Sequence, residues 1–248
     1  MFRFICSAAL LSLMAQPVSA TPANCGALPD HGKLQQALRA NLKASGGPSN
    51  GGLDLPMWAS LVARDGTVCV VAFSGQQWDE QWPGSRVIAV QKASTANAFG
   101  LKTLAISTAN LFSAVQPGGS LFGLQESNPV NAALAYEGAA ADFGAIQDPL
   151  VGKRLGGVNV FGGGLALYDK GEIVGGLGVS GDTSCADHNV AWRVRQALGL
   201  GKVPAGVSKN KDDGIIYDIA SGKSKSGFGH PKCGGKEEKI AKELKAAG

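Results

Sequence analysis

Three histidines, one lysine and one aspartate are the main candidates in this sequence for holding a metal ion or contacting a polar ligand. The histidines are His31, His188 and His230, and no two of them are four residues apart, the spacing that places two zinc ligands on one helix face. A surface or hydrogen-bonding role is the simpler interpretation for each. His188 and His31 are nevertheless candidate metal ligands, because the first follows a glycine-rich strand beside Asp187 and the second precedes the first helix. His230 is expected on the surface of a C-terminal tail.

Lys92 has the context of a pocket residue. It stands in a helical pattern among Ala89, Ala93 and Ala96, so that face of the helix can press closely against a sheet. A solvated lysine is the alternative. In a pocket, its ammonium group could meet the carboxylate of a ligand. Weaker candidates for the same role are Arg86, Arg193 and Arg195.

A glycine pattern of the dinucleotide-binding form, Gly176-x-Gly178-x-x-Gly181, follows a predicted strand and precedes a predicted helix. Dinucleotide binding also needs a βαβ unit and an acidic residue about 20 positions further on, and the pattern here follows the return strand of a hairpin. We therefore reject nucleotide binding. Glycine weakens a strand unless something must approach its backbone closely. The glycines are expected to line a cleft in which a flat ligand lies against the backbone.

Two hairpins and several helices must position these residues. Strands are predicted at 58–63 and 67–73 around an Asp-Gly turn, and at 165–168 and 172–179 around Asp169-Lys170-Gly171. Antiparallel hairpins with helices packed on them define an α+β fold. Between the hairpins, residues 116–129 form a glycine-rich loop with apolar residues. Helices are predicted at 33–44, 85–99, 131–143 and 184–198.

The sequence resembles the GlcG/HbpS haem-binding family in two places. One is the hairpin, glycine-rich strand and helix that begin at Phe161, and the other is the block Lys92-Ala93-Ser94-Thr95-Ala96. The resemblance covers about residues 30–200. It implies a profilin-like antiparallel sheet of five strands with helices on its faces. It further implies haem as ligand, in sequestration, sensing or degradation, and assembly into a homo-oligomer.

Lys92 would then meet a haem propionate, and His188 or His31 would supply the axial ligand of the iron. Asp187 matches an acidic family position, although it could instead cap the helix that begins near residue 184. One alternative is an enzyme that acts on a small carboxylate through Lys92 and Asp187, and another is an assembly module without a ligand. The residues predicted to bind the ligand are Lys92, Phe161, Gly176, Gly178, Gly181 and Asp187.

The chain divides into three parts. Residues 1–20 are expected to be a signal peptide, because one cation and an apolar run precede Val18-Ser19-Ala20, which has the form of a cleavage site. We therefore expect a periplasmic or secreted protein with no membrane anchor after cleavage. Residues 21–200 form the domain and 201–248 a basic extension tied to it. That extension has ten lysines and six acidic residues, but they alternate and no aromatic platform accompanies them, so nucleic acid is not the expected partner.

Four cysteines follow the predicted signal, and an even number in an oxidising compartment indicates two disulfides. We predict Cys185–Cys233, because the segment around Cys233 otherwise has little reason to stay attached. The second predicted bond, Cys25–Cys69, would pin the N-terminal arm across the first hairpin. A competing pairing, Cys25–Cys233 with Cys69–Cys185, would tie the two ends of the chain together.

Overall fold

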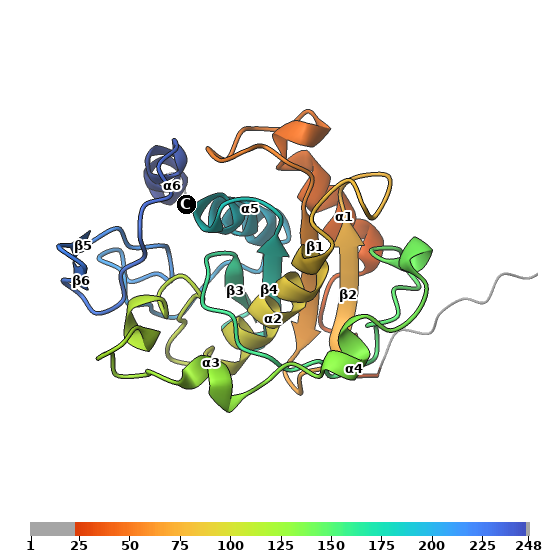
Figure 1. Ribbon diagram of the computed structural model, residues 1–248, viewed down its shortest axis with the longest axis horizontal. Coiled ribbons are helices and arrows are strands. Elements are labelled where there is room, and N and C mark those ends of the chain that lie inside the picture. Colours follow the sequence, from red (N-terminus) through yellow and green to blue (C-terminus); the bar gives the residue numbers. More distant parts are fainter. Residues whose placement is uncertain (1–22, 247–248) are drawn as a thin grey trace, which may run out of the picture.

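One antiparallel sheet of four strands organises the computed structural model, which describes residues 23–246 (Figure 1). The predicted signal peptide, residues 1–20, lies outside the described residues. The strands have the spatial order β2-β1-β4-β3. The α+β class with antiparallel pairing is confirmed, but the sheet has four strands and not five. The four strands are β1 (Trp58–Ala63), β2 (Val68–Phe73), β3 (Gly164–Asp169) and β4 (Glu172–Ser180).

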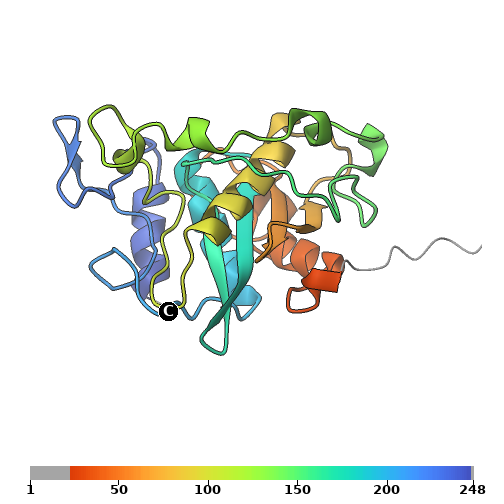
Figure 2. The same cartoon turned by 90° about the horizontal axis from the view of Figure 1, so that it is seen from below.

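Helices cover both faces of the sheet (Figures 1 and 2). Helices α1 (His31–Ala40) and α5 (Ser184–Ala197) share one apolar core with the alternate strand residues that include Leu61 and Leu177. Helix α2 (Gly84–Ala98) packs on the other face, against residues such as Trp58. The shorter or peripheral helices are α3 (Leu124–Ser127), α4 (Ala132–Ala135), α6 (Glu237–Ala246) and the 3-10 turns Ala23–Cys25, Lys43–Ser45, Ser113–Val115 and Ala140–Asp142.

The two predicted hairpins are present, and each turn has the backbone that it requires. Gly66 between β1 and β2 has a φ of 86°. Lys170 and Gly171 between β3 and β4 have φ values of 48° and 85°, and two successive positive φ angles suit the right-handed twist of a two-residue hairpin. The central strands β1 and β4 then pair with Leu61 opposite Leu177, which directs both side chains to the α1–α5 face.

Helix α2 lies unusually close to β4, and the glycines of β4 make this possible. A side chain on Gly178 would overlap the carbonyl oxygen of Ala89, and one on Gly176 would overlap that of Ala93. The close approach predicted for this strand is therefore real, but helix α2 occupies it where a flat ligand was expected. Gly181, with a φ of 150°, packs instead against the segment that includes Met57.

An insert between α2 and β3, residues 99–163, runs along the α2 side of the molecule (Figures 1 and 2). The helix predicted at 131–143 is wrong, because helix α4 stops at Ala135 and Gly138 adopts a left-handed φ of 85°. A buried ion pair anchors the insert, with Arg86 Nε donating to Asp148 Oδ2 over 2.8 Å. Since both side chains are almost fully buried, this pair fixes the insert to α2.

The C-terminal extension wraps over α5 and carries a two-stranded ribbon, β5 (Ile219–Ala220) with β6 (Lys223–Ser224). Arg195 of α5 donates from Nη1 and Nη2 to the two carboxylate oxygens of Asp213, each over 2.7 Å, and both side chains are fully buried.

The structure contains the disulfides Cys25–Cys69 and Cys185–Cys233, the two pairs that the sequence analysis predicts. No helix within residues 23–246 is both long and apolar enough to cross a membrane.

Candidate functional site

Lys92 and Asp187, the two charged residues predicted to bind a ligand, bind each other. Lys92 Nζ lies 2.6 Å from Asp187 Oδ2 and also donates to the carbonyl oxygen of Val179 over 3.1 Å. The lysine comes from α2 and the aspartate from the first turn of α5, on opposite faces of the sheet. They meet beside Gly163, where a side chain would lie 3.2 Å from Lys92 Nζ. The absence of a side chain at Gly163 thus leaves room for the pair.

Burial controls the charge of this pair. It raises the pKa of Asp187 to about 6, and the neighbouring ammonium group of Lys92 only partly opposes that rise. Burial likewise lowers the pKa of Lys92, against the attraction of Asp187. The side chains are 1% and 3% exposed. A ligand carboxylate could reach Lys92 only by displacing Asp187, so the described conformation gives the two residues a packing role and leaves their ligand contact a prediction.

The arginines considered for the same role are also engaged within the chain. Arg86 and Arg195 hold Asp148 and Asp213, as described above. Arg193 donates from Nε to Asn50 Oδ1 over 3.1 Å. These contacts fasten the insert, the extension and the N-terminal segment to the helices of the domain.

The three histidines lie in different environments. His188 is 2% exposed, and its Nε2 accepts a hydrogen bond from the backbone N–H of Ile215 in the extension over 3.1 Å. Iron at that nitrogen would have to displace the extension, and the metal role of His188 stays a prediction. His31 is partly exposed at the start of α1, and its Nε2 donates to the carbonyl oxygen of Gly144 over 2.8 Å.

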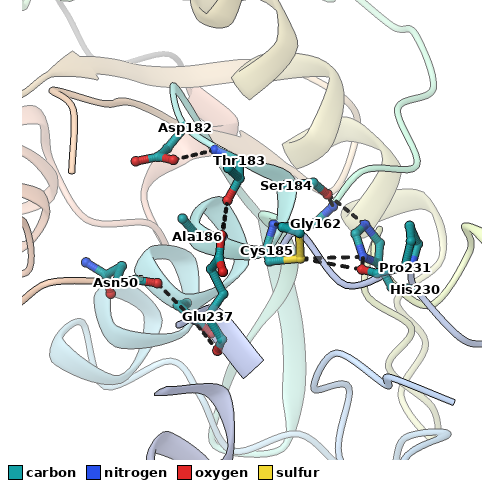
Figure 3. The surroundings of a disulfide bond; sticks show 12 residues. Asn50, Gly162, Asp182, Thr183, Ser184, Cys185, Ala186, His230, Pro231 and Glu237 are labelled. Atoms are coloured by element: carbon teal, nitrogen blue, oxygen red, sulfur yellow. Dashed lines mark hydrogen bonds between the residues drawn. A yellow bond between two sulfur atoms is a disulfide. The ribbon is translucent and has the colours of Figure 1, made fainter. Parts of the chain in front are cut away.

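His230 is buried, which corrects the expectation of a surface position. It is 2% exposed, and burial lowers its pKa to about 4. Its Nδ1 donates to the carbonyl oxygen of Pro231 over 2.7 Å, so its Nε2 accepts a hydrogen bond from Ser184 Oγ, also over 2.7 Å (Figure 3). Cys185 and Cys233 adjoin the ring. Sequence reasoning missed this cluster, because only the wrapping of the extension brings residue 230 to the start of α5.

A pocket of about 280 Å³ lies between α1 and the loop that follows β2, and its lining residues do not include His31. The carbonyl acceptor of His31, Gly144, lines it. The aromatic ring of Phe143 is held between the guanidinium of Arg86, 3.8 Å from the ring centroid, and the edge of Trp78. The other principal lining residues are Gln35, Arg39, Phe73 and Gly75.

Phe161, the remaining residue predicted to bind the ligand, is 46% exposed in the loop before β3. The neighbouring Gly162 donates its backbone N–H to Ser184 Oγ over 2.7 Å. Phe161 therefore lies at the surface near the start of α5. The structure does not bring the predicted site residues together at one accessible cleft within the described residues.

Comparison with known proteins identifies the class of this antiparallel, helix-covered domain. Residues 33–195 match the family model of the haem degrading protein HbpS-like family, which is two thirds of the chain. The chain belongs to this HbpS-like family.

Two curated relatives come from Citrobacter freundii. The corrinoid adenosyltransferase PduO is 32% identical over 148 residues, which are 60% of this chain and 34% of that protein. The chain thus spans about a third of the length of PduO. An uncharacterized 15.0 kDa protein from the dhaT-dhaS intergenic region is 30% identical over 139 residues, which are 56% of this chain and 73% of that protein.

Among solved structures, protein ORFY of Klebsiella pneumoniae is 25% identical and covers 77% of this chain and 98% of its own, with a TM-score of 0.45. The structure of a PduOC:heme complex is 27% identical and covers 71% of this chain and 98% of its own, with a TM-score of 0.48.

Proposed function

We propose that this protein binds haem at the surface pocket beside His31 and does so as an exported protein. Membership of the HbpS-like haem degrading family is the main observation that supports haem as the ligand. Two disulfides support an oxidising compartment, because such bonds persist in exported proteins and are rare in the cytosol. The proposed role is haem sequestration, sensing or degradation.

The exposure and hydrogen bonding of the three histidines support His31 as the iron ligand. His188 and His230 are each 2% exposed and have ring nitrogens held by neighbouring groups of the chain. His31 is partly exposed, and its Nε2 donates a hydrogen bond to the carbonyl oxygen of Gly144. Imidazole is a common axial donor to haem iron. Of the chain's three histidines, His31 therefore requires the least rearrangement to reach a ligand that arrives from solvent.

The chemistry of the pocket also fits a haem group. Trp78 and Phe143, both partly exposed, offer aromatic surface to a flat macrocycle. Arg39 is half-buried at the same place and donates to the carbonyl oxygens of Ser74 and Gly75, so its guanidinium is held where a propionate could pair with it. Bound haem would supply redox chemistry at its iron. The chain's residues would bind and orient it.

We further propose that a second copy of the chain completes the site. The pocket holds about 280 Å³, below the roughly 300–1,000 Å³ of sites that enclose a drug-sized ligand. Haem would therefore remain partly uncovered on one chain, and a homo-oligomer could cover the exposed side.

The alternative function, an enzyme that acts on a small carboxylate, has less support, since the charges of Lys92 and Asp187 already neutralise each other.

Haem titration of the mature protein tests this proposal. We expect a shifted Soret band that saturates at one haem per chain with a Kd in the micromolar range or below, equivalent to about −8 kcal/mol. His31→Ala should weaken binding at least tenfold and change the spectrum. Lys33→Ala is the matched control, because Lys33 lies on the same helix but lines a different pocket. Equal affinity and equal spectra for wild type and His31→Ala would refute the assignment of His31.

A further inference from the structure

The geometry around the start of α5 points to a metal site that the Cys185–Cys233 disulfide conceals. We propose that reduction of this disulfide creates a Zn²⁺ site with Cys185, Cys233 and His230 as ligands. The two sulfur atoms and a ring nitrogen of His230 already lie within 4.8 Å of one another. Cys185 and His230 face each other across the start of the helix (Figure 3).

The donor atoms match tetrahedral zinc in type and separation. Zinc binds cysteine sulfur at about 2.3 Å and histidine nitrogen at about 2.1 Å, so two such ligands are about 3.6 Å apart in a tetrahedron. Cys185 Sγ lies 3.8 Å from His230 Nδ1 in the oxidised protein. Two thiolates with one imidazole leave a fourth position for water, as in catalytic zinc sites with three protein ligands.

The second ring nitrogen of His230 already has the partner that a metal-binding imidazole needs. Ser184 Oγ is 2.7 Å from Nε2, and the ring also packs against Phe112 with 5.2 Å between centroids. When Nδ1 binds the metal, it gives up its hydrogen bond to the carbonyl oxygen of Pro231 and its proton moves to Nε2. Nε2–H then donates to Ser184 Oγ, whose own proton turns away from the ring. Such outer hydrogen bonds orient the imidazole and fix its tautomer. Ser184 is therefore a positioning residue.

The start of α5 favours the thiolate form of both cysteines. Cys185 is the second residue of this 14-residue helix, where the helix dipole stabilises negative charge. Its backbone N–H donates to Cys233 Sγ over 3.2 Å. The helix start thus stabilises a thiolate at Cys185 through the dipole and at Cys233 through the backbone N–H of Cys185, and these effects must outweigh the carbonyl oxygen of Pro231, 3.5 Å from Cys185 Sγ.

Reduction requires a dithiol reductant. One thiolate of the reductant attacks the sulfur of Cys233, the more exposed of the two residues, and the electron pair of the broken S–S bond leaves on Cys185 Sγ. The second thiol of the reductant then releases Cys233. The net change converts the protein disulfide and two reductant thiols into two protein thiols and a reductant disulfide. Zinc binding afterwards releases the two thiol protons.

Other contacts would hold the extension in place once the S–S bond is broken. Arg195 pairs with Asp213, and Thr183 Oγ1 donates to Glu237 Oε1 of α6 over 2.8 Å (Figure 3). The backbone N–H of His230 itself donates to the carbonyl oxygen of Ile216 over 2.7 Å. The three ligands therefore remain near one another in the reduced protein.

The test uses the mature chain, reduced with a dithiol, freed of reductant without oxygen and titrated with Co²⁺ and then Zn²⁺. A Cys25→Ser/Cys69→Ser variant leaves only the thiols of the proposed site. We expect it to bind one metal ion, with a thiolate-to-cobalt charge-transfer band and protection of both thiols from alkylation. Ser184→Ala should weaken zinc binding roughly tenfold to a hundredfold, and His230→Ala at least as much.

A Cys185→Ser/Cys233→Ser variant keeps the other cysteine pair and should bind no zinc under the same conditions. Circular dichroism of each reduced sample reports whether it stays folded. Failure of the reduced Cys25→Ser/Cys69→Ser variant to bind zinc, folded or unfolded, would overturn the proposal. So would equal zinc affinity in the His230→Ala variant, or binding of equal strength by the other cysteine pair.

Discussion

Gly178→Ala should destabilise the fold strongly, although it adds only one methyl group. That methyl group would overlap the carbonyl oxygen of Ala89 and lie 2.5 Å from the backbone nitrogen of Ala93. Both atoms belong to the backbone of α2, which cannot move aside as a flexible side chain can. Added volume in a well-packed core costs about 1–3 kcal/mol, and occasionally more. We expect at least about 3 kcal/mol here, because helix and strand must separate.

For a chain of this length, about 3 kcal/mol corresponds to a fall in Tm of roughly 6–12 °C. Thermal and urea unfolding of the purified protein measure the change. Gly84→Ala is the matched control, since Gly84 begins the same helix and a methyl group there meets nothing within 4 Å. The control should be neutral or stabilise by up to about 1 kcal/mol. Equal stability of Gly178→Ala and wild type would refute helix α2 as the reason for this glycine.

Three further changes test the buried charges and the cross-link. Asp148→Asn should cost about 3–5 kcal/mol in urea unfolding, because it leaves the Arg86 charge buried without its partner; a loss below 1 kcal/mol would contradict this. The Asp187 carboxyl should titrate near pH 6 by carbon NMR, against 3.8 for an ordinary aspartate. Because its folded pKa is raised, its stabilising contribution is complete below pH 4 and is lost as pH rises through 6; titration near 4 would show that burial does not dominate. Replacing Cys185 and Cys233 by serine should cost about 4 kcal/mol, given their separation of 48 residues, and unchanged unfolding would exclude a stabilising cross-link.

Local sequence signals predicted the elements that depend on local chemistry. The Asp65-Gly66 and Lys170-Gly171 turns marked both hairpins, and the structure places strands on either side of each. The predicted helix near residue 131 failed because a left-handed glycine at 138 interrupts it. Apolar periodicity alone does not reveal such an interruption.

The candidate site was harder to predict, because its contacts join distant segments. The glycines of β4 indicated close approach, but a glycine pattern does not say whether a ligand or a helix approaches. Lys92 finds Asp187 across the sheet, and His230 reaches Ser184 through the wrapping of the extension. Burial of polar groups at such separations follows from tertiary packing, so residue type and spacing could nominate these residues but not assign their partners.

The position of iron in haem-loaded crystals tests the central proposal most directly. Anomalous scattering at the iron absorption edge locates the metal independently of the protein coordinates. We predict one iron peak per chain, within coordination distance of the His31 imidazole and beside the pocket that Phe143 and Trp78 line. An iron peak at another residue, or crystals of the haem-treated protein without an iron peak, would contradict the account.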